Sequence, residues 1–141
     1  MLYWDSSALV ASLLAEERTG EVRSFAARHG DLRSYTAILT PLEVESAIQR
    51  RLKERSLSPQ QAARARLLAI DFRKRTYLAT ADQDVLDGAL HLQKIYGLRP
   101  GDAVQLASAR AGTGNPSTVH FLCLDEELND AARQEGFNVP L

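Results

Sequence analysis

The sequence predicts an α/β fold in which a mostly parallel central sheet lies between two layers of helices. Strand-like segments alternate with amphipathic helical segments along the chain, the pattern of parallel strands joined by helical crossovers. Two strand-like segments end just before an aspartate that precedes a helix, at residues 5 and 125. No internal repeat, low-complexity tract or linker interrupts the 141 residues. We therefore expect one α/β/α sandwich domain covering residues 1–141.

The composition is that of an ordinary globular domain, with 45% hydrophobic and 25% charged residues. Cys123 is the single cysteine, so no internal disulfide can form, and the chain does not open with a signal-peptide pattern. No apolar run approaches the roughly 20 residues that a membrane-spanning helix needs. We therefore expect a cytoplasmic protein with no membrane contact.

The expected strands are short runs rich in β-branched and aromatic residues. The first covers the opening residues and ends at Asp5, and Ser6 and Ser7 are then expected to provide the cap and first turn of a helix. The other expected strands cover residues 34–38, 76–79, 118–124 and 137–139.

The segments between the strands carry helix-start signals and helical spacing of apolar residues. Thr40 and Pro41 are expected to cap and begin one helix, because proline lacks only a donor that would be unpaired there. Capping-box spacings at 58–61 and 80–83 open two more. Six predicted helices cover residues 8–15, 21–29, 41–54, 62–74, 102–111 and 126–135, and the helix opened at 80–83 is expected to bury Val85, Leu86, Ala89, Leu92 and Ile95.

Four acidic residues lie at the predicted starts of helices. Asp5 and Asp125 each follow an apolar strand, so their carboxylates meet at one sheet edge if the two strands are near neighbours. Asp102 follows Gly101, and Glu43 lies in the first turn after Pro41. Any one of them alone is explained as a cap or a partner of the helix dipole.

Four such carboxylates together require a further explanation, because each neighbouring pair at about 4 Å costs on the order of 4 kcal/mol at an effective dielectric of about 20. A cluster of this kind either shares protons or holds a cation. Its oxygen-only donors favour Mg²⁺ or Mn²⁺ over zinc. His29, His91 and His120 share no ligand spacing, and Cys123, inside a strand, is expected to be a core residue.

The charge is strongly divided along the chain although the total is only −1. Residues 50–75 contain nine bases and two acids, a net charge of +7, which leaves −8 for the remainder. This segment is either a pair of solvated helices or a surface that follows nucleic-acid phosphates beside the acidic centre.

The four acids and their neighbours resemble the four-acid pattern of PIN-domain nucleases, and the size and spacing look most like VapC-type toxins of bacterial toxin–antitoxin pairs. The resemblance covers essentially the whole chain. The motifs that carry it are YWDSSALV with Asp5, TPLEVESAIQRR with Glu43, LRPGDAVQLASA with Asp102 and FLCLDEELNDAARQEG with Asp125.

The resemblance implies a PIN-like α/β/α sandwich and Mg²⁺- or Mn²⁺-dependent endonucleolytic cleavage of RNA. It also implies a cognate antitoxin protein that occupies the active-site groove, and commonly a homodimer. The four matching acids would be the catalytic and metal-binding residues, and a hydroxyl after the first, Ser6 or Ser7, would help to orient them. Ser6 and Ser7, together with Arg50 and Arg51 of the basic segment, are the expected substrate-binding residues.

Two details of the match remain to be decided by structure. Glu45 rivals Glu43, and since they are about 200° apart on a helix only one can face the site; the motif favours Glu43. Cys123 stands where the family often has threonine, which affects one hydrogen bond near the last acid and not the metal centre.

Two other functional classes are alternatives to the nuclease. A phosphotransferase of the haloacid dehalogenase type also has an aspartate after its first strand, but it requires a second aspartate two residues later, where Ser7 stands. A non-catalytic PIN-fold module that binds RNA or protein would keep the topology and lose acids, whereas this chain retains all four.

Overall fold

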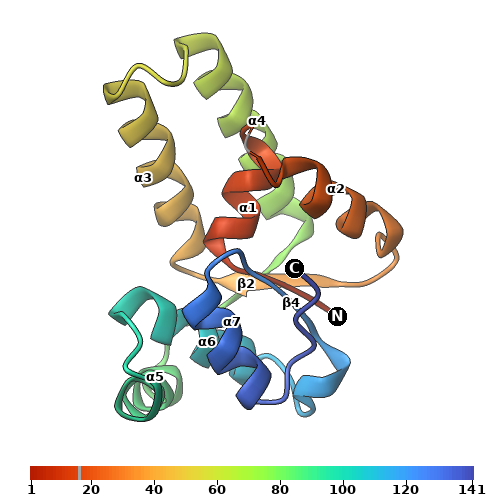
Figure 1. Ribbon diagram of the computed structural model, residues 1–141, viewed down its shortest axis with the longest axis vertical. Helices are drawn as coiled ribbons and strands as arrows, with labels where there is room; N and C mark the ends of the chain where they lie inside the picture. The colour runs from red at the N-terminus through yellow and green to blue at the C-terminus, as the bar shows by residue number, and fades with distance from the viewer. Residues whose placement is uncertain (16) are drawn as a thin grey trace.

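A four-stranded sheet forms the centre of the computed structural model, which describes residues 1–15 and 17–141 (Figure 1). The strands, in chain order, are β1 (Leu2–Trp4), β2 (Ser34–Ala37), β3 (Tyr77–Ala79) and β4 (His120–Leu122). Their spatial order is β3-β2-β1-β4, and every pairing among the described residues is parallel. The predicted parallel sheet is therefore confirmed.

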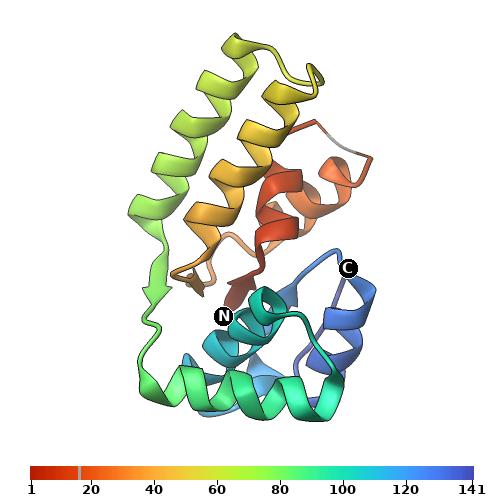
Figure 2. The same ribbon diagram turned by 90° about the vertical axis from the view of Figure 1, so that its left-hand side faces the viewer.

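Helices cover both faces of this sheet, which confirms the predicted α/β/α arrangement. The helices that the structure describes are α1 (Ser6–Leu13), α2 (Thr19–Arg28), α3 (Thr40–Lys53), α4 (Pro59–Arg75), α5 (Gln83–Tyr96), α6 (Pro100–Ala111) and α7 (Glu126–Gln134), with a short 3₁₀ helix η1 (Pro116–Thr118) before β4. Helices α1–α4 pack over one face, and α5–α7 lie on the other (Figure 1). Helices α3 and α4 stand side by side as a hairpin that extends beyond the sheet (Figure 2).

Alternation along β1 divides the core between these two layers. Leu2 and Trp4 belong to the apolar cluster under α1–α4, whereas Tyr3 belongs to the cluster under α5–α7. This is the period of two that a strand imposes on its side chains. A strand buried on both faces explains why the opening residues are apolar without interruption.

Several predicted helix starts are displaced by one or a few residues. Asp5 itself caps α1, accepting a hydrogen bond from the backbone N–H of Ser7, so Ser6 is the first helical residue and not the cap. Helix α3 begins at Thr40, with Leu39 in the cap position. Asp82, not Thr80, caps α5.

The capping box at Ser58 and Gln61 is confirmed, with both of its hydrogen bonds present. Helix α6 begins at Pro100, two residues before the predicted start, because a proline at the first position needs no N–H partner.

Two further predictions about buried segments are corrected. In α5, Val85, Ala89 and Leu92 are buried as expected, but Leu86 and Ile95 are 50% and 54% exposed. Helix α5 packs mainly against α6, so only a narrow stripe of it is covered. The expected strand at 137–139 is reduced to a single bridge between His120 and Asn138. None of the described helices has the length and apolar character needed to cross a membrane.

Gly112, at the end of α6, is expected to be essential for packing against β2. A Cβ atom there would overlap Cε2 and Cδ2 of the Tyr35 ring. Tyr35 cannot easily retreat, because it is buried and its hydroxyl donates to the carbonyl oxygen of Ala109 over 2.9 Å. We expect Gly112→Ala to lower the free energy of unfolding by about 1–3 kcal/mol in denaturant titrations.

The matched control is Gly114→Ala, because a Cβ there meets nothing within 4 Å. It should change the free energy of unfolding by less than about 0.5 kcal/mol. Equal effects of the two substitutions would contradict the proposed packing constraint.

Candidate active site

Two of the four predicted acids follow adjacent parallel strands. Asp5 follows β1 and Asp125 lies shortly after β4, and Trp4 pairs with Leu122 in the register of these strands. The backbone N–H of Asp5 donates to the carbonyl oxygen of Leu122 over 2.9 Å, which continues the pairing to the sheet edge. Each aspartate also caps the helix that follows it, α1 or α7. Strand pairing and helix capping thus fix both backbones at the carboxyl edge of the sheet.

The side chain of Asp102 lies in the electrostatic field of the other three acids. It is half-buried in the first turn of α6. Burial, followed by the charges of Asp125, Asp5 and Glu43, raises the pKa of Asp102 to about 6, while Arg99 opposes the shift. Asp5 is only 3% exposed, and burial raises its pKa despite hydrogen bonds from Ser7. The fold therefore opposes simultaneous ionisation of these carboxyl groups.

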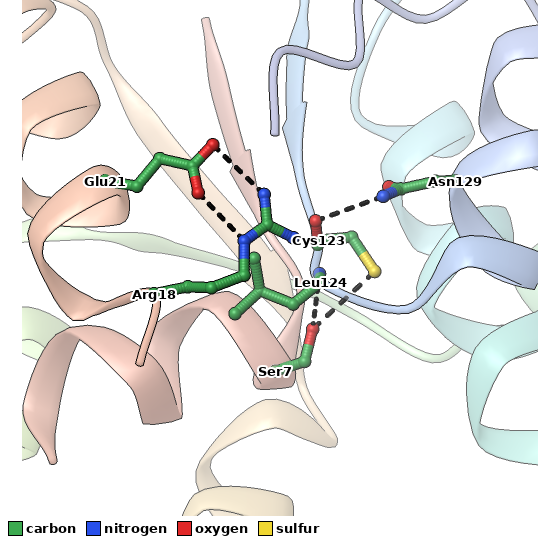
Figure 3. Close-up of polar contacts among 6 residues, drawn as sticks. All are labelled: Ser7, Arg18, Glu21, Cys123, Leu124 and Asn129. Atoms are coloured by element: carbon green, nitrogen blue, oxygen red, sulfur yellow. Dashed lines mark hydrogen bonds and ion pairs between the residues drawn. The ribbon is translucent and has the colours of Figure 1, made fainter. Parts of the chain in front are cut away.

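Ser7, in the first turn of α1, connects Asp5, which follows β1, with Leu124, which follows β4; Figure 3 shows its contact with Leu124. Its hydroxyl donates to Oδ2 of Asp5 over 2.5 Å and accepts from the backbone N–H of Leu124 over 2.9 Å. Oδ2 of Asp5 also accepts the backbone N–H of Ser7 over 2.9 Å. One carboxylate oxygen of Asp5 is thus held by two donors from the same residue.

Cys123 takes part in this junction through its sulfur atom. The thiol is fully buried, 3.6 Å from the hydroxyl of Ser7, and Sγ accepts from the backbone N–H of Asp125 over 3.2 Å. Burial, then the charge of Asp5, raises the pKa of the thiol, so it stays neutral. Asn129 of α7 donates to the Cys123 carbonyl oxygen over 3.3 Å (Figure 3). The sulfur thus supplies a weak acceptor where the resemblance would place a hydroxyl.

Glu43 and Glu45 point toward different helices, as their angular separation requires. Oε2 of Glu43 accepts from Nε2 of Gln105 in α6 over 2.6 Å. Glu45 forms a bidentate ion pair with Arg66 of α4, with contacts of 2.7 and 3.0 Å. Glu43 therefore lies against α6, the helix that carries Asp102, whereas Glu45 is turned toward α4.

An open groove of about 570 Å³ lies beside the acids. The residues that line it include both predicted serines, Ser6 and Ser7, and both predicted arginines, Arg50 and Arg51, together with Glu43, Ser46, Arg99 and Leu124. The structure thus brings together four side chains expected to contact substrate. Arg99 was missed in the sequence because it lies far from the basic segment; its only signal was its position three residues before Asp102.

The histidines lie away from this groove. His29 stacks on Phe25 and His120 meets the same ring edge-on, near the opposite end of the sheet. The two histidine ring centroids are 5.0 Å apart, and His91 is exposed on α5. Across residues 1–15 and 17–141, no three His, Cys, Asp or Glu side chains are arranged closely enough to form a ready metal site. Asp5, Asp125 and Glu43 are near enough to raise the pKa of Asp102, but in the part of the chain that the structure describes the four carboxyl groups do not converge on one point as metal ligands.

Comparison with family models gives a match to the PIN domain over residues 2–134. The chain belongs to the PIN-domain family. Proteins with this domain are generally metal-dependent nucleases, so the fold is of a nuclease type. Comparison with curated proteins gives no significant match.

The raised pKa of Asp102 predicts how pH affects stability of the metal-free PIN domain. In the unfolded chain this carboxyl titrates near 3.8, and in the folded chain near 6. Its contribution to stability is therefore fully present below about pH 4 and is lost as the pH rises through about 6. We expect Asp102→Asn to raise the Tm by a few degrees at pH 7–8, with the difference shrinking as the pH falls and vanishing below about pH 4.

Asp31→Asn is the control, since Asp31 is exposed and outside the groove. Its effect on Tm should not depend on pH in this way. A destabilising effect of Asp102→Asn at pH 8 would refute the assigned repulsion.

Proposed function

We propose that this PIN domain is an endoribonuclease that hydrolyses RNA phosphodiesters with Mg²⁺ or Mn²⁺ held by Asp5, Asp102, Asp125 and Glu43. The observation that carries the proposal is geometric: the parallel pairing of β1 with β4 brings Asp5 and Asp125 to one edge of the sheet in a PIN-domain chain. The raised pKa of Asp102, caused by burial and then by the charges of the other three acids, agrees with it. A divalent cation relieves that repulsion, and carboxylate oxygens are the donors that Mg²⁺ and Mn²⁺ prefer. The donor set thus fits the metal that the family uses.

Each residue of the proposed centre has a separate role in the reaction. When bound, the divalent ion lowers the pKa of a water molecule and neutralises charge on the phosphodiester. Asp5 and Asp125 provide carboxylates on backbones fixed by strand pairing and capping. Ser7 holds one oxygen of Asp5 in place. Glu43, held on one oxygen by Gln105, would hold or orient the attacking water.

The arginines of the groove would bind the RNA backbone. Arg50 and Arg51 approach it from the end of α3, and Arg99 approaches it from the start of α6. Guanidinium groups on two sides suit a phosphate chain that passes over the carboxylates.

The biological setting is proposed on the resemblance in length and motif spacing to VapC-type toxins. The protein would be the toxin of a type II toxin–antitoxin pair, acting in the cytoplasm, commonly as a homodimer. A cognate antitoxin protein would inhibit it by occupying the groove beside the acids.

Metal binding tests the carboxylate centre without knowledge of the RNA target. Calorimetric titration with Mn²⁺ at pH 7.5 should show saturable binding to the wild type and at least about tenfold weaker binding to Asp102→Asn, because that substitution removes a proposed ligand. Cleavage of mixed-sequence single-stranded RNA should be lost in the same variant.

The control variant is Glu45→Gln, since Glu45 is paired with Arg66 and turned to α4. It should bind Mn²⁺ as the wild type does. Wild-type affinity in Asp102→Asn, or a loss in Glu45→Gln as large as in Asp102→Asn, would overturn the assigned centre.

Arg99 is expected to contact a phosphate although it was not predicted from the sequence. Arg99→Ala should weaken binding of a fluorescent single-stranded RNA and reduce the slope of log K against log salt by about 0.7 to 1, as the loss of one phosphate contact requires. Fluorescence anisotropy at several salt concentrations measures both quantities.

The control for this prediction is Arg28→Ala, because Arg28 lies over the Phe25 ring, outside the groove. Its salt slope should equal that of the wild type. An unchanged slope in Arg99→Ala would remove Arg99 from the RNA-binding surface.

A further inference from the structure

A buried polar network connects the sheet to Glu43. It runs through the side chains of Tyr3, Thr36, Thr40 and Gln105, all of which are almost completely inaccessible to solvent. Burying so many polar atoms is costly unless they are hydrogen-bonded, and here each takes part in the network. Gln105, on α6, is only 1% exposed and is the member that contacts Glu43.

The amide of Gln105 can adopt only one orientation in this network. The hydroxyl of Tyr3 donates to Oε1 of Gln105 over 2.5 Å. With Oε1 occupied as an acceptor, the NH₂ group faces Glu43 and Thr40.

The two N–H bonds of this amide are both used. One donates to Oε2 of Glu43 over 2.6 Å, and the other donates to Oγ1 of Thr40 over 3.0 Å. Thr40 is in turn 2.7 Å from the hydroxyl of Thr36, which donates to the carbonyl oxygen of Trp4 over 2.5 Å. The network thus reaches the residue directly before Asp5.

The second oxygen of Glu43 lies beside the start of α6. A Cβ atom on Gly101 would be 3.1 Å from Oε1, so a glycine at this position allows the carboxylate to approach the helix next to Asp102. The two oxygens therefore have different surroundings: Oε2 is held by the buried amide, and Oε1 lies against the residue before Asp102.

We propose that Gln105 is a positioning residue, which holds Oε2 of Glu43 so that Oε1 is presented toward Asp102 and the divalent ion. This inference rests on the proposed function, in which Glu43 contributes to the metal centre. Gln105 does not line the groove, so it acts on substrate and metal only through Glu43. Tyr3 contributes indirectly: its hydroxyl donates to Oε1 of Gln105, so the NH₂ end of the amide is the end that meets the carboxylate of Glu43.

A double-mutant cycle on Mn²⁺ affinity tests the proposal. Gln105→Leu, which keeps the approximate volume of the side chain and removes its donor, should weaken Mn²⁺ binding about 10- to 100-fold in calorimetry. In a Glu43→Ala background, the same substitution should cause no further loss. If Gln105 acted only on stability, Gln105→Leu would lower Mn²⁺ affinity equally in the wild-type and Glu43→Ala backgrounds, and that result would overturn the proposal.

Tyr3→Phe is the second variant, because it removes only the hydroxyl that orients the amide and is the less disruptive change if Gln105→Leu folds poorly. It should weaken Mn²⁺ binding several-fold in the wild-type background and not at all in the Glu43→Ala background. Unchanged affinity in both Gln105→Leu and Tyr3→Phe would refute the positioning role.

If the wild type binds no Mn²⁺, the proposed metal centre is refuted, and thermal unfolding of the same four metal-free proteins tests the contact itself. A smaller loss of Tm from Gln105→Leu in the Glu43→Ala background than in the wild type supports the positioning of Glu43, and equal losses overturn it.

Discussion

The parallel pairing of β1 with both of its neighbours is the constraint on which the rest of the structure depends. In β1 (Leu2–Trp4), Leu2 and Tyr3 pair with β2 on one side, and all three residues pair with β4 on the other. Their side chains enter the cores on both faces. Because β1 and β4 run in the same direction, Asp5 and Asp125 reach the same edge. Ser7 ties the two strand ends together after the pairing stops. A shift of β1 by one residue relative to β4 would therefore have two effects at once: it would move Asp5 away from Asp125, and it would turn the core side chains of β1 to the opposite faces of the sheet.

The acids at this edge are held against their mutual repulsion by two different means. Asp5 and Asp125 are held locally, since each caps the helix that follows it. Glu43 depends on distant residues, because its hydrogen bond comes from α6 and the amide is oriented from β1. Asp102 experiences the resulting field, as the rise of its pKa to about 6 shows. Such a site opposes its own ionised state, which is the expected condition of a centre whose charge is completed by a cation.

The sequence predicted the features that depend on neighbours along the chain. At Asp5 the strand, the aspartate and the helix follow one another directly, so the sequence predicted both the end of the strand and the acid at the sheet edge. The exact capping residue was predicted less well, because Asp, Ser and Thr side chains offer similar acceptors. At the starts of α1 and α5 the cap is an aspartate, Asp5 or Asp82, and not the predicted serine or threonine. The burial of Leu86 and Ile95 was wrong because helical periodicity predicts a face and not how widely a neighbour covers it. Arg99 and Gln105 gain their places only through tertiary contacts, which no local pattern carries.

Tertiary contacts also determine how much of the basic segment, residues 50–75, is placed where it could bind RNA. Its charge suggests a continuous phosphate-binding surface, yet Arg66 is paired with Glu45, which lies outside the segment, so part of that charge is already neutralised. Only Arg50 and Arg51 of the segment line the groove, and Arg99 joins them from α6. In the proposed function, binding near the acids would therefore depend on three arginines from two helices, and the outer part of the hairpin would add only a diffuse, salt-screened attraction. Net charge along a sequence thus overstates the binding surface, because it counts side chains that line the groove together with side chains that lie elsewhere.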